Sequence, residues 1–154
     1  MHEFYRNLFK YDDWANRRVI ESLKALPITE DRPLRPFSHL LATEHNWHCR
    51  LRQNREEMID FFPLFSLDQC ADMADELARK WAQYIEENQA RPAEPVSYRT
   101  TEGREFTSAI QDILFHVANH STHHRGQVAV ALRHLGYEPA VTDYIVYTRK
   151  RDNG

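Results

Sequence analysis

Glycine is scarce in this sequence of 154 residues, with only Gly103, Gly126, Gly136 and Gly154. A β protein with many tight turns needs residues that tolerate left-handed backbone conformations, so long stretches without glycine favour helices. Cysteine is scarcer still, with Cys49 and Cys70 only. Two cysteines exclude a multi-disulfide framework, and we expect both thiols to be reduced.

The sequence also lacks runs of one charge and long apolar runs. Its net charge is −3 and its pI is near 6.3, with no basic stretch of the kind that binds nucleic acid. No apolar run reaches membrane-spanning length, and residues 1–6 lack the pattern of a signal peptide. We therefore expect a cytoplasmic protein with no nucleic-acid or membrane partner. The length and the 42% hydrophobic content predict a single domain over residues 1–154.

Apolar residues recur at helical spacing in four segments, which predicts an all-α protein. The predicted helices cover residues 3–26, 40–58 with Ser38 as N-cap, 66–88, and a fourth that is capped by Thr107 or Ser108 and ends at Gly136. Residues 27–36 are predicted as a linker, and residues 96–100 and 104–107 as a small β-hairpin before the fourth helix. We expect the apolar tail at 141–147 to pack on the bundle.

Histidine is abundant, with nine residues, of which seven fall in two clusters, one on the second and one on the fourth predicted helix. Two histidines four positions apart lie on one helical face and can present two imidazole nitrogens to one ion. In the fourth helix, the pairs 116/120 and 120/124 both have this spacing. At about 100° per residue, His124 lies about 20° and His120 about 60° from the centre of the apolar stripe, whereas His116 lies about 100° away and His123 farther. The inward pair is therefore predicted to be His120 and His124.

Two ligands do not hold an ion, so another helix must supply a third. The second helix offers His39, His45 and His48, among which the helical wheel does not choose. The alternative is that these histidines lie at the surface or bond ordinary partners in the core, but one shared metal satisfies two stacked imidazoles more simply. The HExxH motif is absent, so the usual metalloprotease arrangement is excluded.

Several motifs closely resemble the DinB family of metal-binding four-helix bundles. They are residues 39–47 (HLLATEHNW) and 119–127 (NHSTHHRGQ), supported by residues 11–16, 135–139 and 142–144. The resemblance runs nearly end to end and implies an antiparallel bundle with an unusual order of helix directions. It also implies a three-histidine metal site at His39, His120 and His124. Ser121 stands where the family often has glycine, which should affect packing more than ligation.

The resemblance implies a function as well, because members of the family are similar to thiol-dependent S-transferases and mycothiol-dependent isomerases. Three imidazoles leave a tetrahedral ion with one open position, as catalytic sites require. The resemblance therefore implies a divalent ion, most readily Zn or Ni, a low-molecular-weight thiol as cosubstrate, a small-molecule substrate and a homodimer. Three alternatives stay open: a metal-dependent hydrolase, a metal-binding stress or damage-associated protein without turnover, and a dimerising module that binds no metal.

Other residues are candidates for supporting roles. Glu44 and Asp143 are candidates for orienting a ligand histidine from behind. Arg125 is a candidate for contacting an anionic substrate group, although an ordinary ion pair is the simpler interpretation. Trp14, Trp47 and Tyr11 are candidates for lining the substrate pocket, although aromatic residues at helical spacing more often belong to a core. Phe61, Phe62 and Phe65 are expected to be partly exposed, which favours dimerisation.

Overall fold

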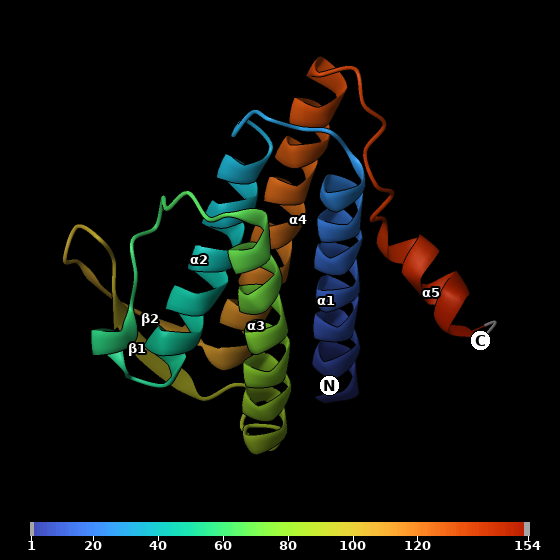
Figure 1. Cartoon of the computed structure of the whole chain (residues 1–154). Coiled ribbons are helices and arrows are strands. Elements are labelled where there is room, and N and C mark those ends of the chain that lie inside the picture. The colour runs from blue at the N-terminus through green and yellow to red at the C-terminus, as the bar shows by residue number, and fades with distance from the viewer. Residues whose placement is uncertain (1, 153–154) are drawn as a thin grey trace.

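Four long helices form a bundle, with a small hairpin at one end and a short helix along its side (Figure 1). The computed structural model describes residues 2–152, so the ends of the predicted domain, Met1 and residues 153–154, lie outside the described residues. The elements are α1 (His2–Ala25), α2 (Leu34–Leu51), the 3₁₀ turn η1 (Arg55–Glu57), α3 (Leu67–Glu87), β1 (Pro95–Arg99), β2 (Glu105–Ala109), α4 (Ile110–His134) and α5 (Tyr144–Asp152). The predicted all-α bundle with a hairpin before the fourth helix is confirmed.

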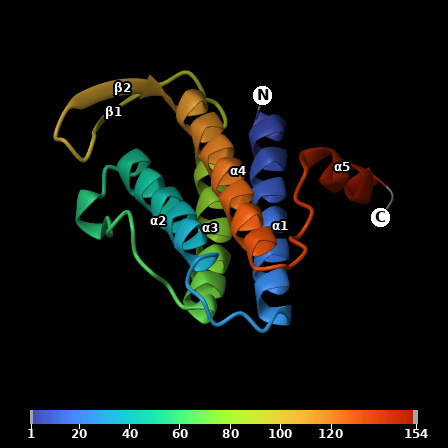
Figure 2. The same ribbon diagram turned by 90° about the horizontal axis from the view of Figure 1, so that it is seen from above.

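The helices follow an uncommon order of directions. In both views α1 and α4 run one way, while α2 and α3 run the other way (Figures 1 and 2). The helices α1 and α2 each pack against both α3 and α4. Because α2 and α3 are parallel, residues 52–66 must run back along the bundle between them. This return segment carries η1 and brings residues 61 and 62 beside the start of α2.

The core lies where the four long helices meet and is built from aliphatic residues around one tryptophan. Trp81 of α3 is 1% exposed and packs against Phe9 of α1, with ring centroids 4.8 Å apart. Phe37, Leu40 and Leu41 of α2 are fully buried against the same core. Burial of this apolar surface is the main favourable contribution to folding. Across the described residues, no helix is both long and apolar enough to cross a membrane.

The predicted bounds of α2 were wrong at both ends. The helix begins at Leu34, because Pro36 falls in its first turn, where a missing backbone N–H costs little. Ser38, predicted as the N-cap, lies inside the helix, and its hydroxyl accepts a hydrogen bond from the Phe65 N–H at 3.0 Å. The helix ends at Leu51 rather than at residue 58, and Gln53 beyond it has a left-handed φ of 55°.

The predicted N-cap of the fourth helix was also wrong. The N-cap of α4 is Ala109, because Thr107 and Ser108, the predicted caps, pair with β1 in the hairpin. The tail forms a helix, α5, which the sequence pattern did not indicate. The tail does pack on the bundle, as expected: the Tyr11 hydroxyl donates to the Thr142 carbonyl at 2.9 Å. In contrast, α3 begins where the sequence predicted a start near Ser66 or Asp68: Ser66 is its N-cap and forms a capping box with Gln69.

Candidate metal centre

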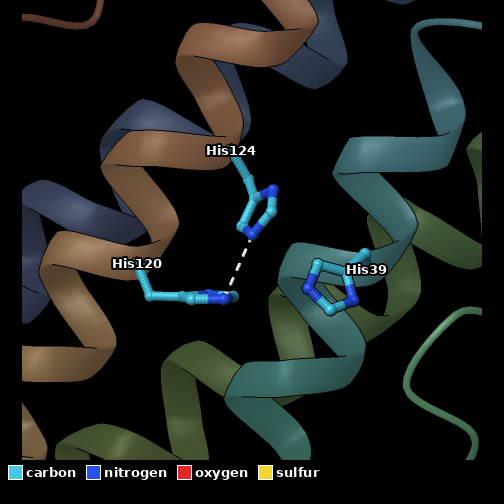
Figure 3. Close-up of side chains that lie close together, drawn as sticks. All are labelled: His39, His120 and His124. Carbon is cyan, nitrogen blue, oxygen red and sulfur yellow. Dashed lines mark hydrogen bonds between the residues drawn. The ribbon is translucent and has the colours of Figure 1, made fainter.

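Three histidines from two helices converge at the centre of the α2–α4 interface (Figure 3). His39 projects from the first half of α2, while His120 and His124 project from successive turns of α4. One ring nitrogen of each lies within 4.8 Å of the others. The Nε2 atoms of His120 and His124 are 3.1 Å apart. A tetrahedral zinc ion separates its nitrogen ligands by about 3.3 Å, so this pair already has nearly the spacing of two ligands.

Hydrogen bonds behind the rings fix which nitrogen of His39 and of His124 faces inward. His39 Nδ1 bonds the Phe61 carbonyl oxygen, and His124 Nδ1 bonds the Gln127 side-chain oxygen at 2.7 Å. Both partners can only accept, so each Nδ1 carries the proton and each Nε2 keeps a lone pair. Acceptors of this kind orient metal-bound histidines in other proteins. Sequence reasoning missed both: Gln127 follows His124 at helical spacing, but nothing in the sequence pointed to Phe61.

Electrostatics favours neutral imidazoles at this place. Burial, together with the charges of the neighbouring His124 and His39, lowers the pKa of His120 to about 3, and burial is the larger cause. Burial is also the main cause that lowers the pKa of His124. Neutral imidazole is the form that binds metals. In addition, His120 Nδ1 is buried and has no hydrogen-bond partner among the described residues. The donor set and its protonation state therefore fit a divalent cation.

A cavity of about 550 Å³ borders His39 and His124. Phe62 lies flat against the His39 ring, with centroids 4.5 Å apart and an interplanar angle of 4°, yet it is 77% exposed. The rest of the wall is partly apolar and partly basic, and it includes Pro36, Val130, Arg32, Arg35 and His134. A small molecule in this cavity would lie beside His39 and His124.

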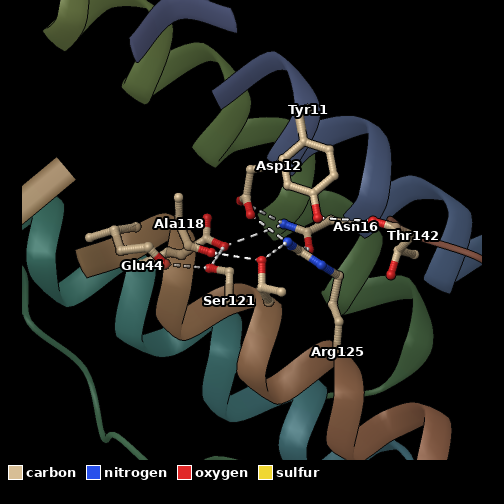
Figure 4. Close-up of polar contacts among 10 residues, drawn as sticks. Tyr11, Asp12, Asn16, Glu44, Ala118, Ser121, Arg125 and Thr142 are labelled. Carbon is tan, nitrogen blue, oxygen red and sulfur yellow. Dashed lines mark hydrogen bonds and ion pairs between the residues drawn. The ribbon is translucent and has the colours of Figure 1, made fainter. Parts of the chain in front are cut away.

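Arg125 occupies a buried polar network next to the site rather than the cavity beside the histidines (Figure 4). Its guanidinium is paired with Asp12 at 2.7 Å and donates to the Asn16 side-chain oxygen at 2.8 Å. Both Arg125 and Asp12 are almost fully buried. The structure thus places Arg125 in an ion pair that joins α4 to α1.

Glu44 belongs to this same network. It is buried on α2 and accepts hydrogen bonds from the Ser121 hydroxyl at 2.7 Å and from Asn16 at 3.3 Å. Burial raises the pKa of Glu44 well above its usual value, and the nearby Asp12 carboxylate raises it further. Its hydrogen bonds go to these residues and not to a ligand histidine. The network links α1, α2 and α4 around the base of the site.

The remaining candidates are spread over the molecule. Asp143 is exposed, and its backbone carbonyl accepts hydrogen bonds at the start of α5. Trp14 packs against Tyr147 of α5, with ring centroids 5.5 Å apart. Tyr11, Asp143 and Arg125 line a separate cavity of about 430 Å³ between α1, α4 and α5, whose wall contains none of the three histidines. The structure therefore does not bring these residues to the metal centre.

Trp47 and the two other histidines of α2 also lie outside the three-histidine cluster. The Trp47 ring lies 5.2 Å from that of His116, which in turn lies 5.7 Å from His120. His45 bonds the Glu57 carbonyl through Nε2 at 2.9 Å. His48 packs edge-on against Trp81 in the core. Of the three candidates for the third ligand, only His39 meets the α4 pair.

A helical bundle that presents three inward imidazoles from two facing helices has the architecture of a metal-binding bundle protein. Comparison with known families matches residues 1–153 to the DinB family, and the chain belongs to that family. A curated relative is Protein DinB of Bacillus subtilis (strain 168), which is 23% identical over 167 residues. The alignment covers 96% of this chain and 95% of the relative.

Proposed function

We propose that His39, His120 and His124 bind one divalent metal ion, most readily Zn or Ni, and that the protein is a metal-dependent transferase that uses a low-molecular-weight thiol. The observation that carries the proposal is the convergence of three imidazoles, two of which have Nδ1 engaged and Nε2 directed inward. A divalent ion held by the three imidazoles would lower the pKa of a thiol bound to it.

The protein's own residues orient the ligand histidines and shape the space beside them. Phe61 and Gln127 hold the rings of His39 and His124 in place through their Nδ1 atoms. Phe62 covers one face of His39 and limits the access of water to that side. The adjacent cavity of about 550 Å³ is large enough for a small thiol together with an electrophile.

The transfer is tested with the metal-loaded protein, a panel of small thiols and 1-chloro-2,4-dinitrobenzene. In this reaction the sulfur forms a bond to the aromatic carbon, the C–Cl bond breaks, chloride leaves, and the thiol proton passes to solvent. We expect thioether formation above the uncatalysed rate, its loss in His120→Ala, and its retention in Gln111→Ala, a change in the first turn of α4 and outside the wall of this cavity. If no thiol gives product in the metal-loaded protein, a structural or sensing role for the metal replaces the transferase.

We also propose that the protein forms a homodimer through exposed apolar residues. Phe62 and Leu64 of the return segment are 77% and 47% exposed, whereas Phe61 and Phe65 are half-buried. Exposed apolar patches commonly mark interfaces. Light scattering on the purified chain measures the mass directly: we expect twice the chain mass, and a monomer at all concentrations would overturn the dimer.

A further inference from the structure

A second site stands out at the far end of α2, where Arg50 is 8% exposed. Its guanidinium carbon lies 4.6 Å from the Trp47 ring centroid, 5.3 Å from Phe61 and 5.8 Å from Tyr98. Three aromatic residues therefore surround a cation that water barely reaches. Cation–π contacts attract a guanidinium, but aromatic rings carry no charge that neutralises it.

Within residues 2–152, Arg50 has no counter-ion, unlike the other buried arginine of the bundle. Arg125 is paired with Asp12, whereas no carboxylate of the described residues lies within ion-pair distance of Arg50. Its Nε is buried and has no hydrogen-bond partner among those residues. Burial lowers the pKa of Arg50, and the charge of the neighbouring Arg55 lowers it further. A buried charge without a partner is unfavourable, so this guanidinium is suited to receiving an anion.

The space for that anion is a cavity of about 340 Å³ at the end of α2, which Arg50 lines together with Gln53, Arg55, Ser97 and Tyr98. Gln53 links the end of α2 to β1 across the cavity wall, because its amide donates to the Arg50 carbonyl at 2.9 Å and to the Ser97 carbonyl of β1 at 3.2 Å. Arg99 also lines the cavity, but Glu105 neutralises it at 2.8 Å. Arg50 and Arg55 therefore give the cavity an excess of positive charge.

We propose that this cavity binds the oxyanion of a small ligand, a carboxylate or a phosphate, with Arg50 as its main partner. Guanidinium donors match both groups, because two parallel N–H bonds fit two oxygens. The cavity is separate from the metal centre, since its wall contains none of the three histidines. Phe61 connects the two places: its ring contacts Arg50, and its carbonyl accepts the hydrogen bond from His39.

The test uses metal-free protein, so that its outcome does not depend on the proposed metal function. Thermal unfolding is followed while inorganic phosphate or malonate is added at constant ionic strength, with chloride as the reference. We expect saturable stabilisation by at least one of the two oxyanions. Saturation by phosphate alone assigns a phosphoryl ligand, and saturation by malonate alone assigns a carboxylate ligand. Stabilisation no greater than that given by chloride would overturn the proposal.

Variants locate the effect. Arg50→Gln should raise the dissociation constant of the oxyanion about tenfold or more, because it removes a charged hydrogen-bond partner. Arg55→Gln, an exposed change in the same cavity, should weaken binding in the same direction and serves if Arg50→Gln does not fold. The matched control is Arg104→Gln in the hairpin turn, where the arginine is exposed and paired with Glu102 at 3.4 Å. If Arg50→Gln binds the oxyanion as tightly as the control does, the proposal is overturned. If Arg50→Gln does not fold, the same comparison is made with Arg55→Gln.

Discussion

Glu44 gives a direct test of the buried network, because its surroundings change the pKa of its carboxyl group. It lies between Asp12, Asn16 and Ser121, with a single guanidinium, that of Arg125, for two carboxyl groups. Burial raises its pKa well above the usual value. The change Glu44→Gln keeps the shape of the side chain and fixes it in a neutral form at every pH.

The sign of the effect follows from proton linkage. Between its unfolded and folded pKa values Glu44 binds more protons in the folded state, so its contribution to stability falls as the pH rises. That contribution is fully present below the unfolded pKa and is lost as the pH rises through the folded pKa. Glu44→Gln removes this dependence. Relative to wild type, the variant therefore gains stability with rising pH, with a slope of at most about 1.4 kcal/mol per pH unit for one proton.

Urea unfolding of metal-free wild type and Glu44→Gln, at steps from about pH 5 to about pH 8, measures this difference. Contributions that the two proteins share cancel in the subtraction. The expected result is a free-energy difference that moves in favour of the variant as the pH increases. A difference that stays constant over the range, or moves the other way, would refute the conclusion that folding raises the pKa of Glu44.

Three further outcomes are expected. Adding Asp12→Asn to Glu44→Gln leaves Arg125 without a carboxylate and should cost about 3–5 kcal/mol more in urea unfolding; less than about 1 kcal/mol would show that the ion pair is not needed. Trp81→Ala should cost about 3–5 kcal/mol in the same assay, because it empties the centre of the core; a loss comparable to a surface change would contradict the packing. Gln127→Ala should lower zinc affinity about 10–100-fold in chelator competition, whereas Gln111→Ala on the same helix should not; equal affinities would remove Gln127 from the site.

The part of the candidate site that lies on one helix could be predicted from the sequence. His120 and His124 are four residues apart on one helix, so periodicity alone placed them together on the inward side of α4. His39 could not be chosen in this way, because helical periodicity did not distinguish it from His45 and His48 as the third ligand. Only the resemblance to a family selected it. The choice depends on how α2 packs against α4, which is a tertiary property that no single-helix pattern contains.

Other parts of the structure could not be predicted from local sequence patterns. The acceptor for His39 is the backbone carbonyl of Phe61, whose position depends on the path of the return segment and not on its side chain. The same holds for Arg50, whose aromatic surroundings come from α2, the return segment and β1. The bounds of α2 were wrong because Pro36 was interpreted as part of a linker, although the first turn of a helix tolerates proline.

The measurement that tests the central claim most directly is calorimetric titration of metal-free protein with Zn²⁺, for wild type and for His39→Ala, His120→Ala and His124→Ala. His134→Ala, an exposed histidine at the end of α4, is the matched control. The three-histidine site predicts one ion per chain in wild type and in the control, with affinity reduced about 100-fold or more in each ligand variant. Wild type that binds no metal ion, or ligand variants that bind as tightly as the control, would contradict the account.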